Sequence, residues 1–574
     1  MQQIRKGLSF ILLFLVLIFS SPAQGPQFEW ARRMGGPGSD LGKAVAFDAA
    51  GNIFSTGYFC GSVDFDPGPG VYFLTSKGAR DLFVQKLDPN GNLLWVRSFG
   101  GVLADEGASI AVDPEDNVVI TGSFQDSVNF NPGPRGSVMI SNGGKDIFVL
   151  ALGGDGHFRW VRGFGGPGID MGISIATGHN GALVVTGSFE ETVDFDPGPE
   201  NFPLVSKGAE DAFIVRLDAE GNFLFAGKMG GIEQFDCGTS VALDEDGNIF
   251  VTGRFRDVSD LDPGPGALVV TAKGVYDIFI LKLDPQGHLL WVKCIGGPGW
   301  DEGHSIAIDS EGNPVIAGTF QYITDFDPGP SAYFLNGGLD ARFFILKLDP
   351  DGNFRFAFSL EEAQVESYCI PLSVAVDPAG NIYATGFFAD TIDFDPGPEE
   401  YVLIADFNPD IFVLKVSPLG DFLWAGRVGG IYYQEDQGRS IAIDPLGNIY
   451  LTGYFEGMED FDPGEEMYYL TAVGEEDIFI TKWTQAPDAT ADQGLPYSFQ
   501  LFPNPTTGTF MLDLGAIYQD VKIEVTALNG QVVQQWQLAM ASTLELTIDT
   551  PPGMYFLQIS IPGGQKTTCK IIRQ

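Results

Sequence analysis

Short apolar runs, bounded by glycine, asparagine and aspartate, follow one another along most of the 574-residue chain. Ile249–Gly253 is a typical run, and a Gly-Asn turn at residues 247–248 directly precedes it. Such turns use the positive φ that glycine allows, and Asp opens them by bonding its own backbone. No segment reads as an amphipathic helix of useful length. The pattern therefore predicts an all-β protein made of short strands.

The runs recur as seven copies of one unit, each marked by the hexapeptide Asp-Phe-Asp-Pro-Gly-Pro or a close variant. The hexapeptide begins at Asp64, Asn129, Asp194, Asp260, Asp325, Asp393 and Asp460, a spacing of 65 to 68 residues. Each unit holds four strand-like runs, and the fourth carries an aromatic residue at one fixed place: Trp95, Trp160, Phe225, Trp291, Phe356 and Trp424. Evenly spaced short strands with one aromatic residue per unit predict the blades of a β-propeller.

The number of strands predicts how the ring closes. The third strand occurs seven times and ends with Asp477–Lys482, but the fourth follows it only six times. The missing copy is at the N-terminus, where Phe28–Arg32 matches Leu94–Arg97. We expect this N-terminal strand to pair with Asp477–Lys482, which leaves no open edge between the last blade and the first. The fold predicted for residues 24–484 is a seven-bladed β-propeller with four strands per blade.

The units resemble a bacterial β-propeller repeat family known as SBBP, from about residue 28 to residue 484. Asp301–Asp309 together with Gly312, and their counterparts in the other units, carry the resemblance. It implies the fold, and it implies little chemistry because that family has no settled activity.

The two ends of the chain read differently from the repeat. Residues 1–23 have a positive start at Arg5 and Lys6, a short apolar core at Leu8–Phe19 and small residues before a cleavage site after Ala23, as a secretory signal peptide does. Residues 485–496 read as a linker. Residues 497–574 contain alternating runs separated by turns and predict a small β-sandwich. The expected strands are Thr509–Leu514, Val521–Thr526, Val532–Trp536, Leu544–Ile548, Met554–Ile561 and Thr567–Ile572.

Residues 497–574 also resemble the type A sorting domain of the type IX secretion system in Bacteroidetes. Four motifs in the family's order carry this resemblance, with the signal residues Pro503, Asn504, Pro505, Gly508, Gly530, Gly553, Tyr555 and Lys570. The family implies passage through the secretion machinery to the outer-membrane surface or the exterior of a Gram-negative bacterium. The alternative is an ordinary adhesive sandwich domain.

Charge narrows the range of partners. Asp and Glu number 75 against 32 Lys and Arg, which gives a formal net charge of −43. Nucleic acid needs a basic surface, so it is excluded as a partner, and anionic membranes are disfavoured. Cations, neutral glycans and basic proteins remain. The five cysteines are odd in number and irregularly spaced, so we read them as small apolar residues and not as a disulfide framework.

The repeated Asp-Phe-Asp-Pro-Gly loop is the best candidate for chemistry. Two carboxylates at i and i+2 of an extended segment point to one side, and hard oxygen ligands suit Ca²⁺. The candidate calcium ligands are Asp64, Asp66, Asp194, Asp196, Asp260, Asp262, Asp325, Asp327, Asp393, Asp395, Asp460 and Asp462. The alternative is structural: the first Asp caps the turn, Phe packs between blades, and Pro-Gly fixes a tight turn. Asn129 and Asn131 would weaken the second site.

A second acidic series precedes each first strand and allows either a carboxylate ring at a channel mouth or simple turn chemistry. Its members are Asp40, Asp105, Asp170, Asp236, Asp301, Glu366 and Asp436. Departures from the repeat mark candidate ligand sites, because a catalytic site breaks symmetry. In blade six these are Glu361, Glu362, Glu366 and Tyr368, and in equivalent loops they are Trp300, Tyr432 and Tyr433, which would stack on sugars. The alternative is drift in a tolerant loop.

Three functions fit this sequence. The first is a secreted or surface scaffold that binds glycan or protein without catalysis, through loops on one propeller face. The second is an extracellular carbohydrate-active enzyme, a hydrolase or lyase, on the same face. The third is a structural repeat protein of a surface layer. Near-identical blades favour the first.

Overall fold

The computed structural model describes residues 25–485, except 135, 233–234, 363–366, 431–434 and 465. It also describes residues 500–573, except 503–508, 528–531, 549–552 and 561–565. The chain divides into two compact units, one of which is Gly25–Gln485. The expected signal peptide and nearly all of the expected linker lie outside the described residues. Within the described ranges, no helix is long and apolar enough to cross a membrane.

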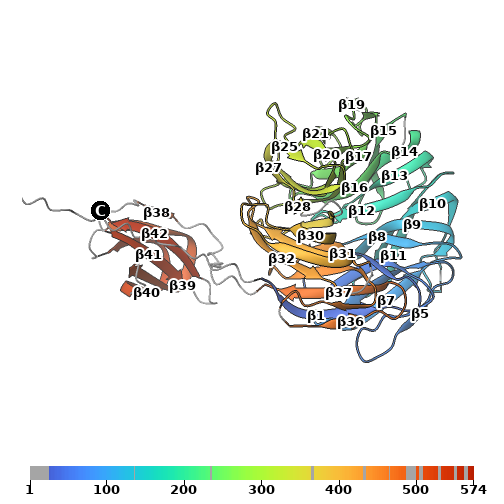
Figure 1. The fold of residues 1–574 in the computed structure, drawn as a ribbon. Coiled ribbons are helices and arrows are strands. Elements are labelled where there is room, and N and C mark those ends of the chain that lie inside the picture. Colours follow the sequence, from blue (N-terminus) through green and yellow to red (C-terminus); the bar gives the residue numbers. More distant parts are fainter. Residues whose placement is uncertain are drawn as a thin grey trace, which may run out of the picture. The chain divides into compact units, whose positions relative to one another are not determined.

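Gly25–Gln485 is a ring of seven antiparallel sheets, or blades (Figure 1), which confirms the predicted propeller. Each blade begins with an inner strand that contacts the inner strands of both neighbouring blades. Given from the inner strand outwards, blade one consists of β2 (Leu41–Phe47), β3 (Ile53–Phe59), β6 (Asp81–Leu87) and β7 (Leu93–Phe99), and blade two of β8 (Glu106–Val112), β9 (Val118–Asn129), β10 (Val138–Leu152) and β11 (Phe158–Phe164). Blade three consists of β12 (Met171–Thr177), β13 (Leu183–Asp194), β14 (Pro203–Leu217) and β15 (Phe223–Gly231). Blade four consists of β16 (Cys237–Leu243), β17 (Ile249–Phe255), β20 (Asp277–Leu283) and β21 (Leu289–Ile295).

Blades five to seven follow the same plan. Blade five consists of β22 (Glu302–Ile308), β23 (Pro314–Phe320), β26 (Arg342–Leu348) and β27 (Phe354–Phe358). Blade six consists of β29 (Tyr368–Val376), β30 (Ile382–Asp393), β31 (Val402–Val416) and β32 (Phe422–Val428), with β28 (Glu361–Glu362) beside β30. Blade seven consists of β33 (Gln437–Ile443), β34 (Ile449–Phe455), β37 (Asp477–Thr484) and β1 (Gln27–Met34). In four blades a short hairpin leads from the second strand to the third: β4 (Ser62–Asp64) with β5 (Phe73–Thr75), β18 (Val258–Asp260) with β19 (Val269–Thr271), β24 (Ile323–Asp325) with β25 (Phe334–Asn336), and β35 (Met458–Asp460) with β36 (Tyr469–Thr471). In blades two, three and six the same hairpin is continuous with the long strands.

The N-terminal strand closes the last blade, as the strand count predicted. β1 pairs antiparallel with β37 in a register that sets Ala31 opposite Thr481 and Met34 opposite Ile478. The Thr481 hydroxyl donates to the Trp30 carbonyl at 3.0 Å. Ion pairs join the same strands, Arg33 with Asp477 and Lys482 with Glu29, both at 2.9 Å. The two ends of the propeller are therefore held in one sheet.

Repeated contacts between blades explain the residues that recur along the sequence. The indole Nε1 of Trp95 in the fourth strand donates to the Gly154 carbonyl in the next blade at 3.0 Å, and Trp30 reaches the Pro89 carbonyl in the same way. The backbone N–H of Val45 donates to the Ser440 hydroxyl at 3.2 Å, which joins the inner strands of blades seven and one. The hexapeptide aromatic is wholly buried in each blade, as Phe65, Phe130, Phe195, Phe326, Phe394 and Phe461, with Leu261 in blade four.

The second unit contains β38 (Gln500–Phe502), β39 (Thr509–Ala527), β40 (Val532–Thr547), β41 (Gly553–Ser560) and β42 (Lys566–Arg573). β39 continues through both of the first two expected runs, and β40 through the next two. The first half of β39 pairs with β38 and the end of β40, and its second half with the start of β40 and with β41. The five strands thus form one hydrogen-bonded sheet over a buried apolar core, and the predicted β-sandwich is not confirmed.

Candidate functional site

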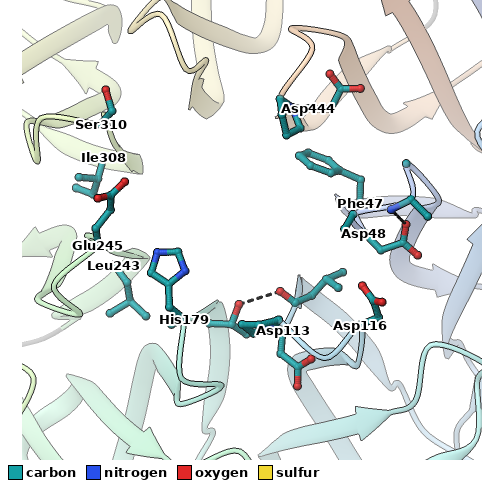
Figure 2. A pocket seen from close by; sticks show the side chains of 18 of the residues that line it. Phe47, Asp48, Asp113, Asp116, His179, Leu243, Glu245, Ile308, Ser310 and Asp444 are labelled. Atoms are coloured by element: carbon teal, nitrogen blue, oxygen red, sulfur yellow. Dashed lines mark hydrogen bonds between the residues drawn. The ribbon is translucent and has the colours of Figure 1, made fainter. Parts of the chain in front are cut away.

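A hollow of about 850 Å³ lies where the inner strands end and turn into the second strands. Figure 2 shows Phe47, His179, Leu243 and Ile308 around its open centre. The lining comes from the turns of six blades, so no single blade builds the site. Its volume is within the range of small-molecule and glycan pockets, and its wall combines apolar and acidic side chains.

The aspartates around this hollow are bonded inside their own turns. Asp48 Oδ1 accepts the backbone N–H groups of Ala50 at 3.0 Å and Asn52 at 2.8 Å, and Oδ2 accepts the Asn52 amide. Lys86 Nζ lies 3.0 Å from the same carboxylate. Although burial raises it, the bonds from Asn52 and Lys86 leave the pKa of Asp48 below its usual value. The same Asp-to-Asn bonds recur at Asp113, Asp244, Asp309, Asp377 and Asp444. These carboxylates hold their turns together, and at Asp48 and Asp309 the lowered pKa disfavours a role as a proton donor.

The hollow is not symmetric. Blade three has Gly178-His179 where other blades have an aspartate and its following residue. Asp116 and Glu245 add exposed carboxylates to the wall. The wall of the hollow therefore combines acidic side chains, apolar side chains such as Phe47 and Ile308, and the imidazole of His179.

The Asp-Phe-Asp-Pro-Gly loop is a hydrogen-bonded turn. Asp64 Oδ1 accepts the backbone N–H groups of Asp66 at 3.0 Å and Tyr72 at 2.7 Å. Asp66 Oδ1 accepts the N–H of Gly68 at 2.8 Å. The other candidate calcium ligands make the corresponding bonds: Asp194, Asp196, Asp260, Asp262, Asp325, Asp327, Asp393, Asp395, Asp460 and Asp462.

Blade two makes the same turn without charge. Asn129 Oδ1 accepts the N–H groups of Asn131 at 3.1 Å and Ser137 at 2.9 Å, and Asn131 Oδ1 accepts from Gly133. The turn therefore needs an oxygen acceptor and not a negative charge. In the described part of the chain, no group of three or more His, Cys, Asp or Glu side chains is arranged to hold a metal ion. Calcium binding by these loops stays a prediction.

The second acidic series is buried beneath the loops that precede the inner strands. Asp40 Oδ1 accepts the N–H of Cys60 and Oδ2 that of Gly36, both at 2.8 Å. Asp105, Asp170, Asp236 and Asp301 make the same pair of bonds. Burial raises the pKa of Asp40 to about 7 against the effect of these bonds. These carboxyls brace loops and do not form an open ring at a mouth; Glu366 lies outside the described residues.

Blade seven has a second buried carboxyl, Glu459, whose charge acts on the buried Asp436, and the sequence reasoning missed Glu459. Glu459 occupies the position of Val63, Val128 and Val193 and is 1% exposed. In blade four this position is Ser259, whose hydroxyl donates to Asp236 at 3.1 Å, so the position faces the buried aspartate of its blade. Burial, followed by the nearby charge of Asp410, raises the pKa of Glu459 to about 8. The signal was present in the sequence as one glutamate among valines.

The candidate ligand residues are only partly brought together. Trp300 is 50% exposed and packs edge-on against Tyr276, with ring centroids 5.1 Å apart. The Arg254 guanidinium lies over the Tyr276 ring, 5.2 Å from its centroid. Glu361 pairs with Asp393 through β28 and β30, and Tyr368 packs on Phe387 in blade six. Glu366, Tyr432 and Tyr433 lie outside the described residues, as does the side chain of Glu362.

The described sorting-signal residues lie in the last strands of the second unit. Tyr555 is buried in β41, and β41 starts at Gly553, which pairs with Arg573. Lys570 in β42 pairs with Phe556. Pro503, Asn504, Pro505, Gly508 and Gly530 lie outside the described residues.

Comparison with known families confirms both resemblances. Residues 500–574 match the family described as the secretion system C-terminal sorting domain, and residues 424–454 match the beta-propeller repeat family SBBP. The sorting domain belongs to the type IX secretion system. It indicates that the secretion machinery handles this chain and exports it to the cell surface or the extracellular space.

Two relatives are longer than this chain. An uncharacterised WD repeat-containing protein of Acanthamoeba polyphaga mimivirus is 24% identical over 518 residues, which cover 80% of this chain and 34% of that protein. Regulatory protein FlaEY of Caulobacter vibrioides is 28% identical over 161 residues, which cover 27% of this chain and 16% of that protein. The chain thus spans about a third or less of the length of these relatives. Among solved structures, PorZ of Porphyromonas gingivalis, a surface component of the type IX secretion system, aligns over 95% of this chain and 100% of its own, with 9% identity and a TM-score of 0.24.

Proposed function

We propose that this exported propeller is a non-enzymatic scaffold that binds a glycan or a protein in the hollow at the turn end of its channel. One observation carries the proposal. The hollow is about 850 Å³, and the aspartates along its wall are already bonded within their own turns. A wall of apolar side chains and fixed acceptors suits recognition, since no proton has to move to or from it.

The test blocks the hollow in the full mature chain. Leu243→Arg adds a long charged side chain to the wall, and Leu419→Arg places the same side chain on an exposed turn outside the lining. We expect the wild-type protein and Leu419→Arg to give the same set of ligands on a glycan array and in binding to extracted surface proteins. Leu243→Arg should lose those ligands while keeping its melting temperature. Equal binding by both variants would place recognition elsewhere.

A carbohydrate-active enzyme is the second candidate, because blade six departs from the repeat at Glu361 and Glu362. Release of reducing ends from bound polysaccharide would support it, provided that the Glu361→Gln and Glu362→Gln variants lose the release. Binding without product would favour the scaffold. A surface-layer repeat protein would show neither.

A further inference from the structure

The inner strands carry a bulge at the same place in every blade. In each of the seven sheets the pairing between the first and second strands skips one residue, as between Gly42 and Ala44 in β2. A bulge leaves one residue out of the ladder and redirects its side chain. We call these residues the bulge ring: Lys43, Ala108, Ile173, Thr239, His304, Leu372 and Arg439.

All seven bulge residues line one cavity of about 330 Å³. It lies towards the start of the inner strands, whereas the hollow of Figure 2 lies at their ends. The flanking residues hardly change between blades, with Gly before the bulge in six blades and Ser after it in six. The bulge residue itself is different in all seven. A repeated frame that presents one different side chain per blade is a means of building a specific site.

The ring has a basic side. Lys43 and Arg439 come from β2 and β33, which are neighbours where blades one and seven meet. Glu106 is shared among three cations: Lys43 Nζ and Lys145 Nζ at 2.8 Å each, and Arg80 at 3.6 Å. Although burial raises it, Lys43 and Lys145 lower the pKa of Glu106 to about 2. Among the described residues, Glu106 is the one carboxylate within 4.0 Å of these three cations.

Arg439 adds a further positive charge. Its guanidinium lies 5.7 Å from the Tyr454 ring centroid, and its Nε is buried without a hydrogen-bond partner in the described structure. Burial raises the pKa of the neighbouring Tyr454 phenol, Arg439 lowers it, and Glu476 and Glu435 raise it. Burial, and then the charges of Arg439 and Arg80, lower the pKa of Lys43 against the effect of Glu106. This is a basic spot in a chain of net charge −43.

The rest of the ring is neutral or balanced. Ala108, Ile173 and Leu372 are apolar, and Thr239 provides a hydroxyl. His304 Nδ1 lies 2.7 Å from the Pro371 carbonyl, to which it donates, and its Nε2 lies 3.7 Å from Glu302. Glu302 is also paired with Arg254 at 2.8 Å.

We propose that the bulge ring binds a carboxylate, held between Lys43 and Arg439, with the body of the ligand against the apolar and hydroxyl side chains across the ring. The arginine fork and the lysine ammonium supply charge-assisted hydrogen bonds, and the cavity has room for about one sugar residue or a small organic acid. This inference stands apart from the proposed function, because its residues and its cavity are different.

The test measures binding to the full mature chain by calorimetry and thermal melting at constant ionic strength. The probes are glucuronate, with glucose as its uncharged counterpart, and citrate. Glucuronate or citrate should raise the melting temperature, and glucose should not. Lys43→Gln and Arg439→Gln should each weaken binding at least tenfold, whereas the exposed control variants Lys207→Gln and Arg355→Gln should bind like wild type. A shift that glucose also causes, or that the controls lose equally, would overturn the proposal.

Ala108→Glu provides a second route that leaves the cations in place. The new carboxylate enters the ring from the blade next to Lys43, so it should occupy the site, abolish glucuronate and citrate binding, and preserve the fold. Undiminished binding by this variant would refute the site. An oligogalacturonide that binds more than tenfold tighter than glucuronate would identify the source as an acidic glycan. Tighter binding of citrate would identify a free organic acid.

Discussion

At the scale of single residues, the seven copies of the repeat act as controls for one another. Asp64 and Asn129 make the same bonds in different blades, which separates the need for an oxygen acceptor from the need for charge. Glu459 and Val63 occupy one position, which isolates the effect of a buried carboxyl. A substitution that copies one blade into another therefore tests a role without inventing a new environment.

Asp64→Asn copies blade two into blade one, and we expect it to leave thermal stability nearly unchanged. Asp64→Ala removes the acceptor for two backbone N–H groups and should cost about 1–2 kcal/mol. Melting curves of the two variants beside wild type check this. If Asp64→Asn were as damaging as Asp64→Ala, the charge itself would matter.

The same melts, with EDTA and then with added Ca²⁺, address the calcium prediction. A metal held by these loops would raise the wild-type melting temperature by mass action, and less so in Asp64→Asn. We expect the turn role to dominate, so that calcium shifts both proteins by the same small amount. A calcium-dependent rise confined to wild type would establish the loops as metal sites.

Glu459→Val copies blades one to three into blade seven, and it should stabilise the protein more at high pH than at low pH. The folded protein keeps the Glu459 proton up to a pKa of about 8, whereas the unfolded carboxyl loses it near its ordinary pKa of 4.5. Between these values the folded state binds more protons, so stability falls as pH rises. The valine removes that loss, with a gain of about 2 kcal/mol at pH 9.

Thermal melts of Glu459→Val from pH 5 to pH 9 measure this effect, with Glu399→Val as a control at an exposed position. The control should show no dependence of its stability change on pH. A constant difference between Glu459→Val and wild type across this range would mean that burial does not raise the pKa of Glu459.

At the scale of elements, most of the fold could be predicted because a strand, a turn and an aromatic recur at fixed spacing. The strand that closes blade seven was predictable for the same reason, since Phe28–Arg32 is a displaced copy of a fourth strand. The bulges were not predictable, because one extra residue shifts the alternation by one position, and a seven-residue strand such as Leu41–Phe47 has too few residues on either side to show the shift. The bulge ring was missed with them, as its members look like ordinary strand residues until the seven blades are closed into a ring.

The C-terminal unit shows a second limit of local pattern. Alternation correctly marked Thr509–Leu514 and Val521–Thr526 as strands, but β39 runs through both. A change of partner within one strand depends on contacts that are distant in sequence, and a window of a few residues does not contain them.

Removal of residues 25–34 should open blade seven. The deletion exposes β37, removes the ion pairs of Arg33 and Glu29, and leaves an unpaired edge, so we expect a lower melting temperature and self-association. A synthetic peptide of residues 25–34 should restore both properties when added. A peptide with Arg33→Glu should restore them less well, because it would face Asp477 with a like charge. An unchanged melting temperature after deletion would show that the pairing of β1 with β37 is not needed for stability.

At the scale of the whole molecule, the two repeated aspartate series oppose each other in pH dependence. The buried series under the loops has raised pKa values, about 7 for Asp40 and Asp170 and about 6 for Asp105, Asp236 and Asp301. The turn series around the hollow includes carboxyls whose pKa is lowered, such as Asp48 and Asp309. The raised series recurs in several blades, so its summed effect should be visible in the stability of the entire propeller.

We therefore expect stability to be greatest near pH 4. Above it, the raised series holds protons in the folded state that the unfolded state has already lost, so stability falls from about pH 4 until these carboxyls ionise at about pH 6 to 7. Below pH 4, the lowered series must take up protons that break its bonds, so stability falls again.

Self-repulsion at a net charge of −43 also lowers stability as pH rises, but 0.5 M NaCl screens it. A melting profile from pH 3 to pH 9 that keeps its fall above pH 4 in high salt would assign that fall to the buried carboxyls. A profile that becomes flat in high salt would assign it to surface charge. Asp40→Asn should reduce the slope by about one blade's share, which links the behaviour of the whole ring to a single repeated residue.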